Sequence, residues 1–380
     1  MRANGEVKER ILIDDDYFTS LLGDIKTAKH YIDIEMYIFS NDIAGIMLSD
    51  ALCDAANRGV GIRVLVDGIG TPDWGNAITV KMEKFGISTK VYHPLPWVIR
   101  HWHYDAHAQD SITSKFIHLL TKVNSRNHRK LCIIDRKIAY IGSANITDHL
   151  INNKGRGSIW RETSVKVSDV QTETLQYAFE KAWGNSKFKK IRAPNLEKIN
   201  ADVIFILNYS WKLRHIYYKS FLNRISISKK RIWVTNSYFV PDNRLLRKLI
   251  NASNRGVEVR ILLPHLSDVL IESLASKIFY SALLKNGVSI YEYLPNVLHA
   301  KSLILDNWYL VGSTNLNYRS IRHDLEVNIN IQSPEATDIL EKQFLVDLEN
   351  SKKIGFQDIE KQPLYQYLLG RIILIFRYWI

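Results

Sequence analysis

The 380-residue chain contains only two cysteines, Cys53 and Cys132, and both lie within apolar runs. Two buried thiols cannot form the disulfide framework that holds small secreted domains together. We therefore expect a reducing compartment and a fold that is stabilised by packing, for which a hydrophobic fraction of 46% is sufficient. At this length we expect two domains or two halves of one domain.

Long apolar runs are also scarce. The first ten residues are polar and charged, and they offer neither a signal peptide nor a membrane span. Residues 363–380 are rich in Leu, Ile and aromatic residues, but Arg371 and Arg377 interrupt them, so this segment is too short and too charged to span a bilayer. We expect residues 351–380 to form an amphipathic tail that lies in the membrane interface, with a buried terminal helix as the alternative.

The chain has fewer acidic than basic side chains. The chain has 39 Asp and Glu against 51 Lys and Arg, which gives a net charge of +12 and an isoelectric point near 9.4. A basic surface of this size suits partners that carry phosphate, either nucleic acid or an anionic membrane.

One motif occurs twice in the chain. The first copy consists of His128, Lys130, Asp135, Gly142, Ser143 and Asn145, and the second of His299, Lys301, Asp306, Gly312, Ser313 and Asn315. In both copies Lys follows His by 2 places and Asp follows it by 7. Gly, Ser and Asn follow at 14, 15 and 17 places in the first copy and at 13, 14 and 16 in the second, so the first has one extra residue, which we place in a turn.

Each copy predicts a β-hairpin, because two short apolar runs flank a polar turn. Side chains alternate along a strand, so His and Lys share one face, whereas Asp135 and Asp306 should point to the other face and have a structural role. The Gly-Ser-x-Asn end precedes a predicted helix, where short polar side chains and free N–H groups favour an anion. We therefore predict that Ser143, Asn145, Ser313 and Asn315 bind a phosphate, that both lysines supply charge and that the histidines supply the chemistry. A single copy would more often be a solvated strand end, but its repetition favours catalysis.

The duplication extends beyond the motif. A strand, a helix and a strand are predicted at residues 31–39, 43–57 and 60–66, and again at 231–240, 245–254 and 257–263. The sequence Asn-Arg-Gly-Val starts at Asn57 and again at Asn254, 197 residues later. We predict a first half at residues 1–185, a linker at 186–200 and a second half at 201–350, followed by the tail.

The halves differ most before the motif, where Gly86 and His128 lie 42 residues apart but Gly287 and His299 only 12. The surplus contains His101, His103 and His107 among Trp and Tyr. We expect no metal there, because no acidic or cysteine ligand is clustered with them, and we predict an aromatic, basic loop that rims the site and touches lipid headgroups. Residues 211–231 are basic with interleaved aromatics, which suits a membrane surface, nucleic acid or a solvated helix face.

The two motifs resemble the H-x-K-x4-D pairs of the phospholipase D superfamily, and residues 10–335 are similar to bacterial cardiolipin synthases of the short type that lacks amino-terminal membrane spans. The resemblance rests also on the stretches that begin at Asp14, Ala56, Tyr238 and Asp324. It implies an α/β fold of two duplicated phospholipase D-like αβα lobes with mixed sheets and an active site at the pseudo-twofold interface. It implies a catalytic set of His128, Lys130, Asp135, His299, Lys301 and Asp306. Within this set His128 is the expected nucleophile and His299 the expected acid, and Glu162 and Glu326 are the carboxylates expected to orient the histidines. The resemblance implies neither a metal nor a cofactor.

The same resemblance implies a phosphatidyltransferase that forms cardiolipin from two phosphatidylglycerol molecules through a phosphatidyl-histidine. The expected partners are an anionic phospholipid membrane and phosphatidylglycerol, with the protein peripheral on the cytoplasmic face of the inner cell membrane. The alternatives are a phospholipase D that releases phosphatidic acid, a superfamily nuclease, which the aromatic tail and the Trp- and His-rich loop disfavour, and a membrane-organising protein with a dead site, which the complete motifs disfavour. The sequence does not determine the oligomeric state.

Overall fold

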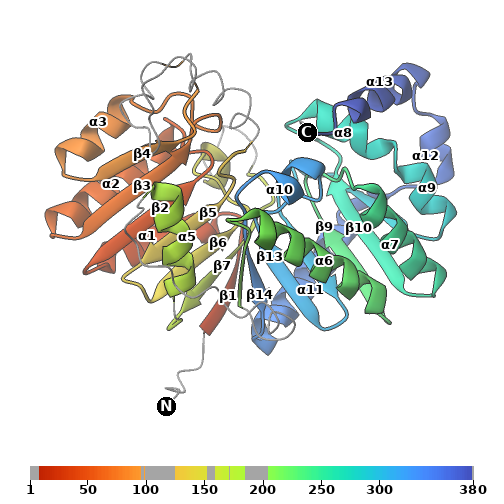
Figure 1. Cartoon of the computed structure of the whole chain (residues 1–380), viewed down its shortest axis with the longest axis horizontal. Helices are drawn as coiled ribbons and strands as arrows, with labels where there is room; N and C mark the ends of the chain where they lie inside the picture. Colours follow the sequence, from red (N-terminus) through yellow and green to blue (C-terminus); the bar gives the residue numbers. More distant parts are fainter. Residues whose placement is uncertain are drawn as a thin grey trace.

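The computed structural model describes residues 8–95, 98, 125–151, 159–170, 172–184 and 204–378. The predicted linker at 186–200 and the loop that contains His101, His103 and His107 lie outside these residues. Two mixed β-sheets, one from each half of the sequence, stand side by side with helices on their outer faces (Figure 1). This is the α/β architecture of two duplicated lobes that the sequence predicts.

The first sheet has seven strands. In spatial order they are β1 (Lys8–Ile13), β7 (Thr163–Ser168), β6 (Ile138–Gly142), β5 (Lys130–Ile134), β2 (Tyr31–Met36), β3 (Gly61–Asp67) and β4 (Ser88–Tyr92). The pairs β2–β3 and β3–β4 are parallel, and the other pairs are antiparallel. The helices of this half are α1 (Asp16–Thr27), α2 (Ile43–Asn57), α3 (Ala77–Lys84), the 3₁₀ turn η2 (Asp148–Leu150) and α5 (Glu173–Trp183).

The second sheet has eight strands, which repeat the first order with one strand added at the edge. They are β15 (Ser351–Lys353), β11 (Ser289–Tyr293), β10 (Glu258–Pro264), β9 (Arg231–Thr235), β12 (Ser302–Leu305), β13 (Trp308–Gly312), β14 (Val327–Ile331) and β8 (Phe205–Leu207). The helices are α6 (Trp211–Ile227), α7 (Asn243–Asn254), α8 (Leu270–Lys277), α9 (Tyr280–Lys285), α10 (Tyr318–Arg322), α11 (Pro334–Glu349), α12 (Phe356–Glu360) and α13 (Leu364–Ile375).

Helix boundaries follow from the same local signals in both halves. The side chain of Asp42 accepts a hydrogen bond from the backbone N–H of Gly45 at the start of α2, and Asp242 does the same for Arg244 and Leu245 at the start of α7. Gly59 and Gly256 follow these helices with φ of +91° and +87°, a conformation that only glycine adopts without strain. The predicted helix 43–57 is confirmed, and α7 begins two residues before the predicted start.

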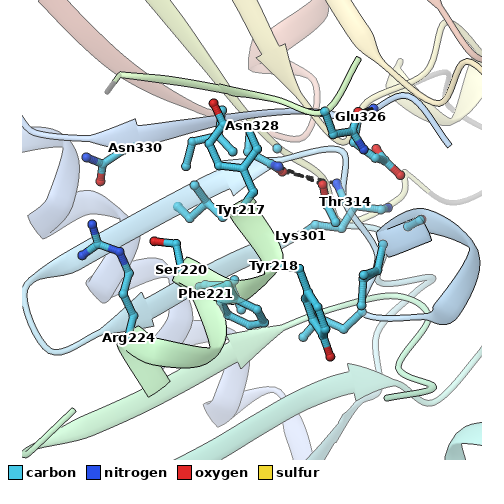
Figure 2. A pocket seen from close by; sticks show the side chains of 18 of the residues that line it. Tyr217, Tyr218, Ser220, Phe221, Arg224, Lys301, Thr314, Glu326, Asn328 and Asn330 are labelled. Carbon is cyan, nitrogen blue, oxygen red and sulfur yellow. Dashed lines mark hydrogen bonds between the residues drawn. The ribbon is translucent and has the colours of Figure 1, made fainter. Parts of the chain in front are cut away.

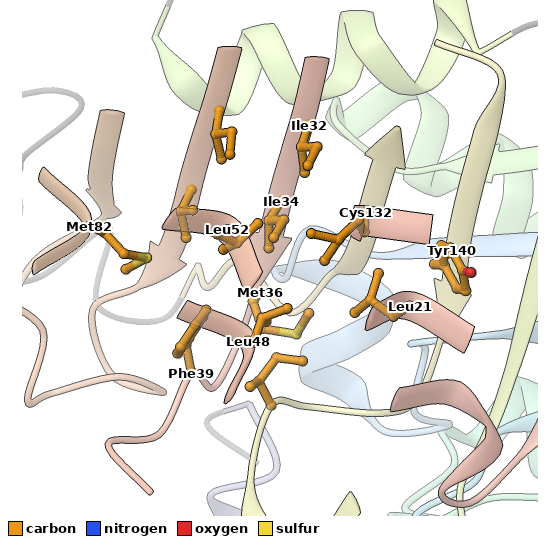
Figure 3. Close-up of a cluster of buried hydrophobic side chains, with 14 of the residues drawn as sticks. Leu21, Ile32, Ile34, Met36, Phe39, Leu48, Leu52, Met82, Cys132 and Tyr140 are labelled. Carbon is orange, nitrogen blue, oxygen red and sulfur yellow. The ribbon is translucent and has the colours of Figure 1, made fainter. Parts of the chain in front are cut away.

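Alternation along the strands divides the apolar side chains between three cores. In β5, Cys132 and Ile134 face the core beneath α1 and α2, whereas Leu131 and Ile133 face the second sheet. Figure 3 shows the first of these cores, in which Ile32, Ile34 and Met36 of β2 pack against the helices. A third core lies beneath α6, α7 and α9 in the second half.

The middle core joins the two halves. Strand β6 contacts β13 and β14, and β7 contacts β13, so the inner faces of the two sheets pack on each other. Apolar side chains from both sheets form one buried cluster there, which includes Ile141 and Val165 of the first half and Val311 and Ile329 of the second. Because this cluster is continuous, the two motif-bearing hairpins are held rigidly against one another.

The carboxy-terminal segment forms α13, which packs against α8 through one side. Gly370 is buried there, and a Cβ in its place would overlap the backbone oxygen of Leu274. The other side of α13 is exposed, with Leu368, Ile372 and Ile375 at 53%, 53% and 76% of their full exposure. The helix therefore docks on the fold through one side and presents an apolar face to solvent, while its position in the membrane interface stays a prediction.

No helix in the described ranges is both long enough and apolar enough to cross a bilayer.

Candidate active site

Both motif histidines lie at the start of the predicted hairpins, His128 two residues before the first residue of β5 and His299 three residues before that of β12. Three residues connect β5 to β6 and two connect β12 to β13, so the extra residue of the first copy lies in the turn, as predicted. Backbone hydrogen bonds then cross between the halves. The N–H of His128 donates to the carbonyl of Leu325 at 3.0 Å, and the N–H of His299 donates to the carbonyl of Arg161 at 2.9 Å.

These crossed bonds set up a crossed pairing of side chains. Nδ1 of His128 donates to Oε1 of Glu326 at 3.0 Å, and Nδ1 of His299 donates to Oε1 of Glu162 at 2.7 Å. Each histidine is thus oriented by the carboxylate that follows the other half's motif. With Nδ1 engaged, Nε2 is the ring nitrogen that remains for chemistry.

The electrostatics of the two pairs differ. Burial lowers the pKa of both imidazoles, and that of His128 falls well below its ordinary value. Burial raises the pKa of Glu326 to about 7 despite the nearby Lys130. For Glu162 burial acts in the same direction, but His299 and Lys301 outweigh it and the pKa is lowered, so this carboxylate is ionised beside its histidine.

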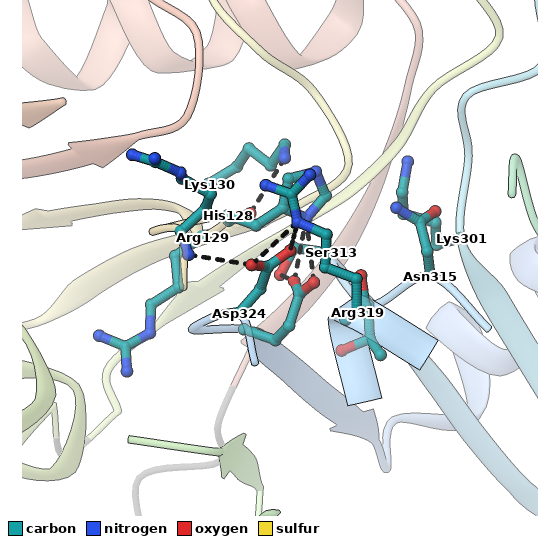
Figure 4. A network of polar contacts seen from close by, with 12 residues as sticks. His128, Arg129, Lys130, Lys301, Ser313, Asn315, Arg319 and Asp324 are labelled. Carbon is teal, nitrogen blue, oxygen red and sulfur yellow. Dashed lines mark hydrogen bonds and ion pairs between the residues drawn. The ribbon is translucent and has the colours of Figure 1, made fainter. Parts of the chain in front are cut away.

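The two motif lysines are buried on the same side of the hairpins as the histidines. Nζ of Lys130 donates to the carbonyl of His128 at 3.0 Å, and Nζ of Lys301 donates to the carbonyl of His299 at 2.6 Å. Burial, aided by the other lysine's charge, lowers the pKa of Lys130 to about 7, and burial lowers that of Lys301 to about 8. Two cations held in a desolvated site are poised to attract an anion such as phosphate. Figure 4 shows how His128 and Lys130 face the second-half residues.

The two motif serines contact the orienting carboxylates. The hydroxyl of Ser143 donates to Glu162 and that of Ser313 donates to Glu326. A hydroxyl has a single proton to donate, so each serine helps to hold a carboxylate in this arrangement, and its predicted role in binding a phosphate stays a prediction.

The asparagines fit the predicted role better. Oδ1 of Asn145 accepts from the backbone N–H of Ile38 at 3.3 Å, and Oδ1 of Asn315 accepts from the hydroxyl of Ser237 at 3.2 Å. These bonds fix each amide with its NH₂ as the group that can donate to a substrate oxygen. The helices expected after Asn145 and Asn315 are only the 3₁₀ turn η2 and the five-residue α10, so no helix N-terminus supplies the predicted anion site.

Asp135 and Asp306 lie in the hairpin turns, at the end of the strand remote from the histidines. The Asp135 carboxylate accepts from the backbone N–H groups of residues 29, 30 and 31, and that of Asp306 accepts from those of residues 229, 230 and 231. These contacts support the structural role that strand alternation predicted for the two aspartates. Their place in the catalytic set, which rests on the motif alone, stays a prediction.

Sequence reasoning missed the aromatic walls of the site. The ring of Tyr37 lies 4.8 Å from that of His128, and the ring of Tyr238 lies 6.2 Å from that of His299. Nζ of Lys130 lies 4.9 Å from the centre of the Tyr37 ring. Trp160 adds a further wall, 5.5 Å from His299. Tyr37 and Tyr238 each follow the strand beside the hairpin, β2 and β9, and this equivalence was the signal that could have revealed them.

Beside His128, Asp324 organises a second polar group. Its Oδ1 accepts from the backbone N–H of Arg126 at 2.9 Å, and its Oδ2 pairs with Nε of Arg319 at 3.2 Å (Figure 4).

No cluster of three side chains that could hold a metal occurs in the part of the chain that the structure describes.

Comparison with known proteins places these features in context. A family model described as "Cardiolipin synthase, PLD-like domain" matches residues 21–183 and 221–348. A cardiolipin synthase of Alkalihalophilus pseudofirmus is 28% identical over 369 residues, which cover 95% of this chain and 70% of that protein. A cardiolipin synthase of Geobacillus kaustophilus is 27% identical over 357 residues, which cover 92% of this chain and 67% of that protein.

Two solved structures share the fold at low sequence identity. Phosphatidylserine synthase of Haemophilus influenzae superposes with a TM-score of 0.64 at 12% identity, over 97% of this chain and 94% of that one. Polyphosphate kinase of Porphyromonas gingivalis superposes with a TM-score of 0.58 at 13% identity, over 90% of this chain and 50% of that one.

Proposed function

The chain belongs to the family of phospholipase D-like domains of cardiolipin synthases, and we propose that it transfers a phosphatidyl group between two phosphatidylglycerol molecules to give cardiolipin and glycerol. The observation that carries this proposal is the crossed pairing of His128 with Glu326 and of His299 with Glu162. It supplies two oriented histidines for one reaction centre, which a double displacement at phosphorus requires.

In the first step Nε2 of His128 attacks the phosphorus of one phosphatidylglycerol. The new P–N bond forms as the P–O bond to glycerol breaks, and His299 gives its proton to the departing glycerol oxygen. The pKa directions support the assignment. Burial lowers the pKa of His128 well below 6.5 and keeps it neutral, whereas the ionised Glu162 opposes the smaller lowering that burial causes at His299.

In the second step the terminal hydroxyl of another phosphatidylglycerol gives its proton to His299. Its oxygen attacks phosphorus, the P–N bond breaks and His128 returns to its neutral form. Lys130, Lys301, Asn145 and Asn315 supply the positive charge and hydrogen-bond donors for the phosphate oxygens in both steps. The buried site disfavours capture of the intermediate by water, so transfer should exceed hydrolysis.

We also propose that the protein is peripheral on the cytoplasmic face of the inner cell membrane. The exposed apolar side of α13 adjoins α8, on which Leu270 and Ile271 are also exposed, and α13 lies at the upper right of the molecule in Figure 1. Tyr378 follows α13 and lies 4.6 Å from the ring of His323, one residue before Asp324. The apolar surface, which continues through Tyr378 to residues beside the site, can enter the interface of a membrane. The net charge of +12 favours a membrane whose lipids are anionic, and such a membrane would also supply the lipid substrate.

The test is incubation with phosphatidylglycerol vesicles and quantification of every product. The proposal predicts cardiolipin and free glycerol in equal amounts. Phosphatidic acid as the dominant product, with little cardiolipin at high lipid density, would make the protein a hydrolytic phospholipase, while cleavage of nucleic acid without lipid turnover would make it a nuclease.

A further inference from the structure

A cavity lies in the second half between α6 and the outer face of β12, β13 and β14 (Figure 2). The empty space in and around it, open solvent at the mouth included, amounts to roughly 1040 Å³. Much of its wall is apolar or aromatic, and the residues that form this part are Tyr217, Tyr218, Phe221, Leu303, Trp308, Leu310 and Leu316. Lys301 and Glu326 also line it, so the cavity shares a wall with the active site.

The internal duplication offers a comparison for this cavity. The Asp135 carboxylate receives the N–H groups of residues 29–31 and the Asp306 carboxylate those of residues 229–231, so positions in α1 and α6 correspond with an offset of 200. Ser220 and Arg224 therefore correspond to Ser20 and Asp24. The pairing of Gly142 with Ser164 and of Gly312 with Asn328 likewise aligns β6 with β13 and β7 with β14.

In the first half the corresponding space is filled by Tyr140, which is fully buried. Its hydroxyl lies 2.9 Å from Oγ of Ser20 and also contacts Asp24, and Asp24 in turn pairs with Nζ of Lys166 at 2.6 Å. Four polar groups thus satisfy one another around one aromatic ring.

In the second half three of these four positions have changed. Leu310 stands in place of Tyr140, Arg224 in place of Asp24 and Asn330 in place of Lys166, while serine is retained at 220. The second half therefore lacks the aromatic ring of Tyr140 that fills the space in the first half, and it has the basic Arg224 where the first half has the acidic Asp24. Ser220, Arg224 and Asn330 gather at one end of the cavity, away from Lys301 and Glu326 (Figure 2).

This wall matches the chemistry of an anionic amphiphile. A guanidinium, an amide and a hydroxyl together recognise an oxyanion, and an apolar wall recognises a hydrocarbon chain. The guanidinium of Arg224 is held over the Trp308 ring at 4.6 Å, which orients it at the cavity's end, and Asn330 is buried in the wall with 6% exposure.

We propose that the cavity is a second lipid site, which binds one hydrocarbon chain of an anionic lipid along the apolar wall toward Lys301, with its anionic group at Ser220, Arg224 and Asn330. The choice of a lipid as the natural ligand rests on the proposed function, whereas the ability to bind an anionic amphiphile rests on the cavity. Because the bound chain would touch Lys301 and Glu326, occupancy is also expected to alter the turnover rate.

The probe is dodecyl phosphate, kept below the concentration at which it forms micelles, and the readout is calorimetric binding together with the fluorescence of Trp308. Subtracting the signal of Trp308→Phe isolates this tryptophan from the other eight. We expect a Trp308 signal that saturates at one molecule per chain. Inorganic phosphate, which the catalytic lysines attract, should leave the Trp308 signal unchanged because it has no hydrocarbon chain. A dodecyl maltoside of equal chain length should bind the cavity about tenfold more weakly, because it lacks the charge.

Two variants test the cavity and its charged end separately. Leu310→Tyr restores the ring of the first half and should abolish binding, whereas Arg224→Gln should weaken dodecyl phosphate by about tenfold without changing the maltoside. The matched control is Lys166→Asn, which makes the corresponding replacement in the first half and should leave binding unchanged. Thermal melting of each variant identifies any that fails to fold, and Arg224→Gln tests the proposal independently if Leu310→Tyr does.

Equal binding of dodecyl phosphate to wild type and to folded Leu310→Tyr would overturn the proposal. Loss of dodecyl phosphate binding on substitution of Ile375 would also overturn it, because the ligand would then bind the exposed face of α13 and not the cavity. His299→Ala should still bind dodecyl phosphate. A protein that binds the probe but makes no cardiolipin would refute the proposed function alone, and one that makes cardiolipin without binding the probe would refute the second site alone.

Discussion

Nδ1 of His299 donates to Oε1 of Glu162 at 2.7 Å, although the two residues belong to different halves of the chain. The corresponding bond from His128 to Glu326 crosses in the opposite direction. Neither half therefore contains a complete pair of motif histidine and orienting carboxylate, and the catalytic apparatus exists only where the two sheets pack together.

The first prediction separates the two carboxylates. Glu162→Gln should lower kcat by roughly 10³-fold, because it removes the charge that stabilises a protonated His299. Glu326→Gln should cost only about tenfold, because burial raises the pKa of Glu326 to about 7 and its charge is already partly suppressed.

The control for this pair is Glu292→Gln. Glu292 is buried and lies 2.8 Å from Nδ1 of His265, so it reproduces a glutamate–histidine contact outside the site. Its variant should retain wild-type turnover. Equal losses for Glu162→Gln and Glu326→Gln would show that the two pairs do not differ in charge.

The second prediction concerns pH. Lys130 and Lys301 must be protonated to hold a phosphate, and their pKa values are lowered to about 7 and about 8, so turnover should fall as pH rises through these values. Burial lowers the pKa of both histidines, and that of His128 falls well below 6.5, so protonation of the nucleophile should produce an acidic limb only below 6.5. Loss of the proton from His299, the acid, should add to the decline in rate as pH rises. Initial rates on phosphatidylglycerol, with thermal stability followed over the same range, provide the measurement. A rate that stays constant up to the ordinary lysine pKa of 10.5 would contradict the role given to the lysines.

The third prediction separates structure from chemistry within the motif. Asp306→Ala should remove about 1–2 kcal/mol of stability, because three backbone N–H groups lose a partly solvated carboxylate partner. The pKa of Asp306 is lowered on folding, so this contribution is complete above 3.8 and is lost as pH falls through the lowered value. The melting temperature should drop while kcat of the folded fraction remains near that of wild type. Asp338→Ala, at an exposed position on α11, should change neither quantity, and a large loss of kcat in folded Asp306→Ala would support this residue's place in the catalytic set.

The fourth prediction concerns the apolar face of α13. Replacing Leu368, Ile372 and Ile375 by serine should weaken binding to phosphatidylglycerol vesicles by at least about tenfold, because each exposed side chain contributes on the order of 1 kcal/mol when it enters the interface. Cleavage of a short soluble phosphodiester should be unaffected. The matched controls are Ile46→Ser and Val80→Ser, which remove exposed apolar side chains from the first half. Parallel loss of vesicle binding and soluble turnover would mean that α13 serves only the fold.

Much of this arrangement was predictable from local sequence. The repeated spacing predicted the duplication, the hairpins and the extra turn residue, because each depends on strand periodicity and on a few neighbouring residues. The same alternation assigned Asp135 and Asp306 to the face away from the chemistry. The short distance between Tyr238 and His299 could not be derived this way, because it depends on how neighbouring strands end.

The crossed pairing was beyond sequence reasoning for the same physical reason. Glu162 and Glu326 were identified as orienting carboxylates, but which histidine each serves depends on how the two sheets pack. The contacts of Ser143 and Ser313 with these carboxylates were not predicted, because no pattern within the motif reveals that a buried carboxylate competes with a phosphate for the single hydroxyl proton. The cavity in the second half follows from Leu310 in place of Tyr140, and its significance appears only when the two halves are superposed.

The most direct test of the two-histidine mechanism is to locate the covalent intermediate. The protein is mixed with phosphatidylglycerol, quenched within the first turnover and digested, and the peptides are analysed by mass spectrometry under conditions that preserve phosphoramidates. We predict a phosphatidyl group on His128, its absence in His128→Ala, and loss of turnover to below about one hundredth in both His128→Ala and His299→Ala. Cardiolipin formation with the adduct on His299 alone, or with full turnover in either variant, would contradict the mechanism.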